Sequence, residues 1–148
     1  MVFVTSDHGG WFQKQKLVGW LRRRGVDVRD LGPNHVDRDD DYPLWAARLA
    51  RLIQRHPTSR GLLLCRSGVG MAMTANKFVG VRAAQAFTPR MAARARHDDN
   101  INVLSLAADY HTSRQLQAMA WAWLQARFRP LRRYRRRLRQ VRRIEHGR

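Results

Sequence analysis

The stretch that decides the fold is GLLLCRSGVG, residues 61–70. Residues 61–65 are continuously small or apolar, which is typical of a strand buried on both faces of a parallel sheet. The glycines that follow, Gly68 and Gly70, predict a tight turn from this strand into a helix that continues to about Asn76. The stretch therefore predicts a strand–turn–helix unit at the centre of an α/β fold.

Four further apolar runs of strand length flank this unit, and helical patterns separate them. In the first helical pattern, Phe12, Lys16 and Leu17 have the spacing of a core-facing stripe. Strands that alternate with helices form right-handed βαβ crossovers and a parallel sheet with helices on both faces. The sequence thus predicts a three-layer α/β/α Rossmann-like sandwich with a five-stranded parallel sheet and an extended basic C-terminal helix. We expect strands at residues 2–4, 26–28, 61–65, 81–86 and 102–106. We expect one helix that ends near Gly25, one that begins at Tyr42, one that follows Gly70, and two more at residues 89–96 and 113–126.

The composition excludes several classes of protein. The chain has 148 residues, enough for one domain with a hydrophobic core, and its 44% hydrophobic content is too high for a disordered chain. Its single cysteine excludes an internal disulfide framework and a cysteine-based zinc ribbon. No apolar run reaches the roughly 18 residues of a membrane span, and no signal peptide is visible. We therefore expect a cytoplasmic protein.

The formal net charge is +18, and the last 22 residues carry more than half of it. Residues 127–148 contain eleven arginines and one acidic residue, Glu145, for a net charge of +10. We divide the chain into an α/β domain, residues 1–126, and an Arg-rich C-terminal helix, residues 127–148, that packs on the body or on a partner subunit. A basic tail also fits a nucleic-acid-binding module, which is a function of a different class. The three- and four-residue steps of an amphipathic helix are carried by Tyr134, Leu138, Val141 and Ile144.

Ligands of parallel sheets bind beyond the carboxyl ends of the strands, so the loops there carry the candidate residues. Cys65 ends the central strand, and a thiol beside a helix N-terminus can have a lowered pKa, which suits a base or a nucleophile; the alternative is a buried structural cysteine. The backbone N–H groups of residues 67–70 fit a phosphate or an enediolate, or belong to a purely structural turn. Asp7 and His8 fit a sugar or phosphate contact, or an Asp helix cap beside an exposed His. The run His-Asp-Asp-Asn, residues 97–100, is expected as a loop that polarises a sugar or binds water.

Five short motifs follow one another along the chain: Asp7-His8-Gly9-Gly10, Asp41-Tyr42-Pro43, Cys65-x-Ser67-Gly68-Val69-Gly70, Ala75-Asn76-Lys77-Phe78-x-Gly80-x-Arg82 and Asn102-Val103-Leu104. In combination they are far more specific than any one of them alone. Together with Arg133 and Arg137 in the tail, they resemble the ribose-5-phosphate isomerase type B family, which also includes the galactose-6-phosphate isomerase subunits. The resemblance covers the chain from Val2 to Glu145.

The resemblance implies aldose–ketose isomerisation of a sugar phosphate, such as ribose 5-phosphate to ribulose 5-phosphate, through a cis-enediolate. It implies neither a metal nor another cofactor. Cys65 would move the proton between C1 and C2, and Ser67 would assist ring opening or hold the sugar. The oxyanion hole would consist of the N–H groups of Gly68, Val69 and Gly70.

The resemblance also implies a homodimer or homotetramer whose active site lies at the subunit interface. Asp7 and Tyr42 would line the sugar site. His8 would bind the phosphate together with Arg133 and Arg137, which the C-terminal helix of the partner subunit would supply. Bidentate guanidinium groups suit such a dianion.

Several positions depart from the pattern of the family. Counted without gaps from the central cysteine, Asp98 stands where relatives that open the sugar ring carry a His, and His97 lies one position early. Asp99 stands in place of Asn, Asp109 in place of a phosphate-binding Arg, and Arg66 in place of a frequent Gly. Either His97 or Asp98 is then the candidate for ring opening, and Asp99 is a candidate substrate contact. These departures leave open a non-catalytic, sugar-phosphate-binding member of the same fold.

Overall fold

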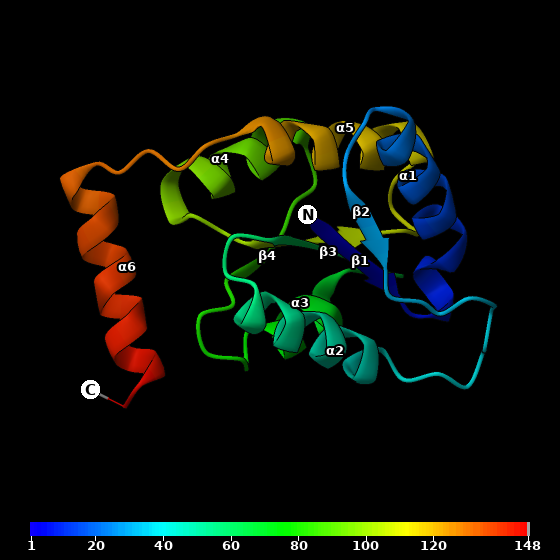
Figure 1. Ribbon diagram of the computed structural model, residues 1–148, viewed down its shortest axis with the longest axis horizontal. Helices are drawn as coiled ribbons and strands as arrows, with labels where there is room; N and C mark the ends of the chain where they lie inside the picture. The colour runs from blue at the N-terminus through cyan, green and yellow to red at the C-terminus, as the bar shows by residue number, and fades with distance from the viewer. Residues whose placement is uncertain (148) are drawn as a thin grey trace.

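Five strands form the sheet: β1 (Val2–Ser6), β2 (Val28–Asp30), β3 (Arg60–Cys65), β4 (Ala83–Gln85) and β5 (Val103–Ala107). The computed structural model describes residues 1–147. All strand pairs are parallel, in the order β2-β1-β3-β5-β4 (Figure 1). Leu62 of the central strand β3 lies opposite Val4 of β1 and Leu104 of β5. The predicted five-stranded Rossmann-like sheet is thus confirmed, with the apolar run that defines it at its centre.

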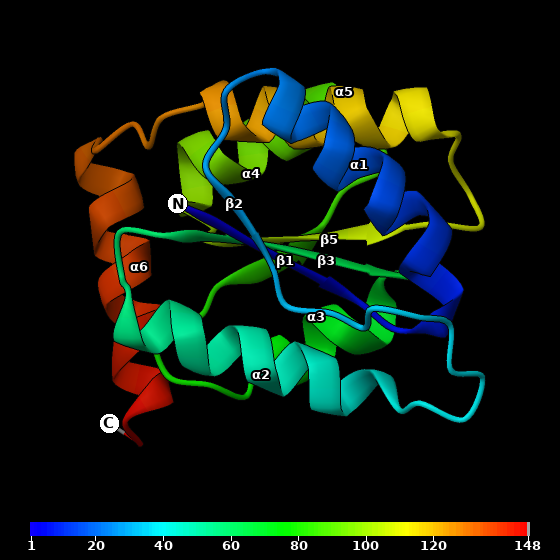
Figure 2. The ribbon, with the colours of Figure 1, turned by 45° about the vertical axis from the view of Figure 1, so that its right-hand side comes forward.

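The helices are α1 (Trp11–Arg23), α2 (Tyr42–Arg55), α3 (Val69–Ala75), α4 (Pro89–Asp99), α5 (Ser113–Gln125) and α6 (Arg132–Glu145), and a 3-10 turn, η1 (His8–Gly10), precedes α1. Figure 2 shows α1, α4 and α5 on one face of the sheet and α2 and α3 on the other. Alternate residues of β3 point to opposite faces of the sheet. Leu62 and Leu64 accordingly join the core beneath α1, α4 and α5, whereas Leu63 and Cys65 join the core beneath α2 and α3. This alternation directs the cysteine toward the α2/α3 side of the sheet.

The C-terminal helix α6 lies beside the amino ends of the strands, away from the end where the strands finish (Figure 1). Tyr134 is its one buried residue, and the Glu145 carboxylate accepts the Gly80 N–H at 3.3 Å. A groove of about 460 Å³ separates much of the helix from the body. Ile144 remains 75% exposed, so α6 is held to its own chain at only a few points.

The inward face of α1 differs from the prediction. Phe12 is 66% exposed and Lys16 is exposed, whereas Lys14 is completely buried with Leu17. The helix begins only at Trp11, after the 3-10 turn, and this start sets the rotation of the helix. The core-facing prediction is therefore wrong for Phe12 and Lys16, and it left out Lys14, the buried cation of this helix.

Element ends also differ from the prediction. β2 begins at Val28, because Val28 lies opposite Val2, where its neighbour β1 starts. β4 begins only at Ala83, because side chains take the backbone groups at its start: Asn102 accepts the Arg82 N–H at 2.7 Å, and Asn76 accepts the Ala83 N–H at 2.7 Å. The expected loop at residues 97–99 is wrong, since these residues form the last turn of α4. Within residues 1–147, no helix is long and apolar enough to cross a membrane.

Candidate active site

One set of candidate residues converges at the carboxyl ends of β1 and β3. Asp7 follows β1, Cys65 ends β3, and the turn that leads into α3 follows at once. Asp7 is 6% exposed and accepts the Gly10 N–H at 2.9 Å, so it caps η1. Its carboxylate also lies close enough to Cys65 to affect the pKa of the thiol. Tyr42 packs on the same turn, since a Cβ added at Gly70 would lie 2.7 Å from its ring. The structure therefore brings the predicted acid, thiol, phenol and backbone donors together.

The thiol of Cys65 is 5% exposed and accepts a hydrogen bond from the Gly68 N–H at 3.0 Å. Burial raises the pKa of this thiol, and the neighbouring Asp7 carboxylate raises it further, while the N–H bonds of the turn oppose the shift. The expectation of a lowered pKa is wrong for the chain alone. A thiol whose pKa is raised keeps its proton at neutral pH and makes a strong base once it is ionised.

Two side chains that the sequence analysis did not single out orient the turn at residues 67–70. Gln85 of β4 donates its amide to the Ser67 carbonyl, and Ser105 of β5 donates its hydroxyl to the Gly68 carbonyl at 2.6 Å. With these carbonyls held from the sheet side, the Gly68 N–H is directed at the sulfur of Cys65. Gly68 has a φ of 77°, where a glycine is strongly preferred. The signal in the sequence for this contact was Ser105, a polar residue within the apolar strand segment Leu-Ser-Leu, residues 104–106.

His8 is held by a carboxylate from the loop between β2 and α2. Its backbone N–H bonds Asp40 at 3.0 Å and its ring Nδ1 lies 2.7 Å from the same oxygen, while Trp45 donates to the other oxygen at 2.8 Å. The hydrogen bond to Asp40 is the largest cause that raises the pKa of His8, and Asp7 adds to it. The ring is consequently cationic over a wider pH range than a free histidine, which suits an anionic ligand.

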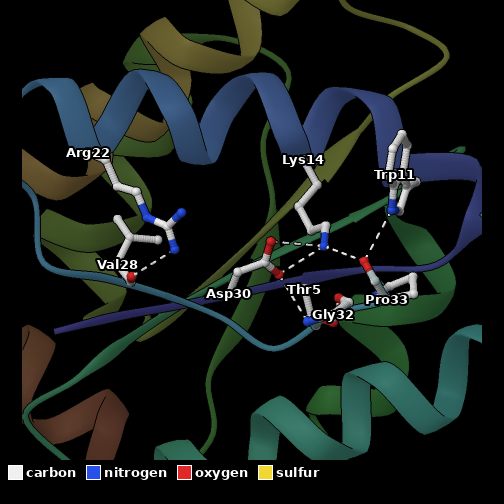
Figure 3. Close-up of polar contacts among 8 residues, drawn as sticks. All are labelled: Thr5, Trp11, Lys14, Arg22, Val28, Asp30, Gly32 and Pro33. Carbon is white, nitrogen blue, oxygen red and sulfur yellow. Dashed lines mark hydrogen bonds and ion pairs between the residues drawn. The ribbon is translucent and has the colours of Figure 1, made fainter. Parts of the chain in front are cut away.

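Lys14 of α1 anchors the start of the same loop (Figure 3). Its buried Nζ bonds both oxygens of Asp30, at 2.8 and 3.0 Å, and the Pro33 carbonyl at 2.9 Å. Thr5 donates to the Gly32 carbonyl at 2.8 Å from β1. These bonds fix residues 30–33, the start of the segment that carries Asp40 and Tyr42 to the site. The signal in the sequence was a lysine three residues before Leu17 on the core-facing side of a helix.

The remaining candidates gather at the opposite end of the sheet. α4 runs back from the carboxyl end of β4, so His97, Asp98 and Asp99 lie next to the amino end of β5, and the His97 carbonyl accepts the Arg129 N–H at 2.9 Å. β5 has five residues, and at about 3.3 Å per residue it separates the two ends by roughly 15 Å.

Two arginines of α6 belong to this second group. Arg133 stacks 4.7 Å from the Tyr134 ring and bonds its hydroxyl at 3.1 Å. This bond raises the pKa of Arg133, and Asp98 contributes as well, which places the α4 carboxylate near the start of α6. Arg137 follows one turn later. A single chain therefore holds the candidate site as two separate halves.

Comparison with known proteins decides the family. A family model described as Ribose/Galactose Isomerase matches residues 2–141. A probable ribose-5-phosphate isomerase B of Mycoplasma pneumoniae is 38% identical over 127 residues, which cover 86% of this chain and 84% of that protein. The chain belongs to the ribose/galactose isomerase family.

Other members of the ribose/galactose isomerase family are similar in sequence and in structure. The D-erythrulose-4-phosphate isomerase of Pectobacterium atrosepticum is 35% identical over 127 residues, covering 86% of this chain and 84% of that protein. The crystal structure of ribose-5-phosphate isomerase B from Mycoplasma genitalium, with bound ribulose 5-phosphate, superposes with a TM-score of 0.94 at 36% identity and covers 99% of this chain and 97% of that one.

Three of the positions that the sequence analysis named as departures from the family pattern, Arg66, Asp98 and Asp109, engage one another or a neighbour. Arg66 lies 3.8 Å from Asp109, and both side chains are well exposed, so the added cation and the added acid offset each other weakly. Asp98 is bound by Arg94 at 3.1 Å, one turn earlier in α4. Two family-motif residues, Asn76 and Asn102, hold the start of β4 and are therefore structural.

Proposed function

We propose that the chain catalyses the interconversion of ribose 5-phosphate and ribulose 5-phosphate, working as a cytoplasmic homodimer. The observation that carries this proposal is the Cys65 thiol at the end of the central strand, 3.0 Å from the Gly68 N–H and beside Asp7. A buried base next to preorganised donors suits proton abstraction beside a carbonyl. Membership of the ribose/galactose isomerase family supports this chemistry.

In the proposed reaction, Cys65 first loses its thiol proton to solvent, and the thiolate then removes the C2 proton of the open-chain aldose. The electrons of the C–H bond form the C1–C2 double bond of a cis-enediolate, and the negative charge moves to the carbonyl oxygen. The N–H groups of Val69 and Gly70, in the first turn of α3, have no acceptor within the helix, and in this proposal they bind the oxygen, for which Val69 gives up its 3.3 Å bond to the Ser67 hydroxyl. Transfer of the hydroxyl proton from O2 to O1, and return of the abstracted proton to C1, complete the ketose, and Ser67 holds the sugar.

The two halves of the site come together in this proposal across the dimer. His8 of one protomer binds the phosphate together with Arg133 and Arg137 of the C-terminal helix, residues 127–148, of its partner. Helix α4 of the same partner brings His97 and Asp98, because Asp98 lies near Arg133. Asp98 is held by Arg94, whereas His97 has no such ion pair among the described residues, so we assign ring opening to His97. Asp99 is exposed and contacts the sugar.

The test is an assay of ribulose 5-phosphate formation by the purified protein, with Cys65→Ala as the inactive comparison. Erythrulose 4-phosphate and hexose 6-phosphates serve as alternative substrates, since a D-erythrulose-4-phosphate isomerase is among the relatives. We expect turnover of a pentose phosphate and its loss in Cys65→Ala. Absence of turnover on every sugar phosphate in a folded protein would refute the proposal.

A second candidate, a sugar-phosphate-binding protein without catalysis, is favoured by one observation. Asp98, where relatives carry the ring-opening His, is engaged with Arg94 in an ion pair. This candidate predicts that sugar phosphates raise the thermal midpoint without conversion. Any turnover removes it.

A further inference from the structure

Helix α6 carries two stripes of identical spacing. Tyr134, Leu138, Val141 and Glu145 form the body-facing stripe: Tyr134 is 8% exposed, Glu145 bonds Gly80, and the other two line the groove beside the body. At 3.6 residues per turn, a shift of two residues turns about 200° around a helix, so a stripe shifted by two residues lies on the opposite face. The residues at that shift form the arginine stripe: Arg132, Arg136, Arg139 and Arg143.

The arginine stripe is exposed and lacks anionic partners. Within residues 1–147, none of its guanidinium groups has a carboxylate within 4 Å. The stripe spans eleven residue steps, or about 16 Å at 1.5 Å per residue. A shallow hollow near its end is lined by Arg139, Arg142, Arg143 and His146, and by no acidic residue.

The proposed isomerisation does not use this stripe. Arg133 and Arg137, the phosphate ligands proposed above, lie one residue further along from Arg132 and Arg136, which places them about 100° around the helix. In the proposed dimer, the partner subunit meets the face of α6 that carries Arg133 and Arg137, and Arg139 also lines the groove against the body. The side chains of Arg132, Arg136 and Arg143 are exposed and do not line this groove.

We propose that the arginine stripe binds the phosphodiester backbone of nucleic acid without sequence preference. Guanidinium groups bind phosphate oxygens in a bidentate manner, and a duplex offers one negative charge per about 1.7 Å of axis, so 16 Å presents roughly nine phosphates to the stripe. No aromatic side chain lies in the stripe to stack on bases. The stripe itself contains no apolar residue to insert into a bilayer, and the exposed Ile144 beside it is a single side chain, which favours nucleic acid over an anionic membrane.

The experiment measures the affinity of the full-length protein for fluorescent duplex DNA and for RNA of unrelated sequences, over a range of salt concentrations. Two variants are compared at the four stripe positions, all four Arg→Gln and all four Arg→Lys. We expect the Gln variant to reduce the slope of log K against log salt by about 3 to 4 and the affinity at 0.1 M salt by roughly 10³-fold. The Lys variant keeps the slope, and both variants keep isomerase turnover and the thermal midpoint.

Three outcomes would overturn the proposal: an unchanged slope in the Gln variant, binding to phosphatidylserine vesicles but not to nucleic acid, or equal binding to polyglutamate at matched charge. Should the fourfold Gln variant fold poorly, Arg136→Gln/Arg143→Gln provides the same test, with an expected loss of about half the slope change. A double variant that folds and keeps the full slope refutes the proposal equally.

Discussion

Replacement of Gly68 by Ala tests how tightly the turn after β3 is constrained. The φ of 77° at Gly68 costs an L-residue about 1–2 kcal/mol. An added Cβ would also lie 3.0 Å from Gln85 Nε2 and 3.3 Å from the Leu106 carbonyl carbon. Since overpacking of a filled site costs about 1–3 kcal/mol, we expect Gly68→Ala to destabilise the protein by about 2–5 kcal/mol.

Gly25→Ala is the matched control. Its φ of 73° is nearly the same, and nothing lies within 4 Å of an added Cβ. It carries only the backbone cost, about 1–2 kcal/mol, and any gain from a less flexible unfolded chain is common to both variants. The difference of about 1–3 kcal/mol should appear as an extra loss of roughly 3–10 °C in thermal midpoint.

Calorimetry and kinetics together check this prediction. Displacing the turn shifts the Gly68 N–H away from the Cys65 sulfur, so kcat/KM should fall by about 10-fold or more in Gly68→Ala and stay unchanged in Gly25→Ala. Equal stability losses in the two variants, with activity retained in both, would refute the inferred packing of the turn.

Two further changes probe the loop between β2 and α2. Asp40→Asn removes the main cause of the raised pKa of His8. Substrate affinity falls as His8 loses its proton, so this fall should occur at lower pH in the variant. An unshifted profile of KM against pH would contradict the role of Asp40. The stability that the His8–Asp40 pair contributes is present below the pKa of His8 in the unfolded chain and is lost as pH rises through its pKa in the folded protein. The destabilisation by Asp40→Asn should therefore be largest in acid, and urea unfolding at several pH values measures it. Lys14→Met leaves Asp30, whose side chain is 18% exposed, without its cation and should cost about 3–5 kcal/mol by urea unfolding, against less than about 0.5 kcal/mol for exposed Lys16→Met. Equal costs for the two lysine variants would show that the buried ion pair does not hold the loop.

The sequence predicted the sheet because its decisive features are local. The apolar run at residues 61–65 fits only a strand buried on both faces, and Gly68 fits the turn that follows it. The pattern failed where a long-range contact reversed a local preference. Lys14 is buried because Asp30 and the Pro33 carbonyl, distant in sequence, receive its charge.

The residues of the candidate site were predictable from the sequence to a greater extent than their arrangement in space. Asp7, Cys65 and Tyr42 follow strand ends or open a helix, and parallel topology gathers them at one edge of the sheet. His97 became a candidate for ring opening by family resemblance alone, and within one chain the direction of α4 carries it to the end of the sheet opposite Cys65. The orienting contacts of Gln85 and Ser105 depend on sheet register, which no local pattern specifies.

The central claim is that a working isomerase site takes Cys65 from one subunit and Arg137 from its partner. The most direct measurement mixes two inactive variants, Cys65→Ala and Arg137→Ala, after dissociation and reassociation. Half of the randomly formed dimers are mixed, and each mixed dimer holds one intact site and one doubly altered site, so about a quarter of the wild-type activity should return. If both residues served the same subunit's site, no mixed dimer would hold an intact site. A mixture that stays as inactive as its two components would then contradict the shared site.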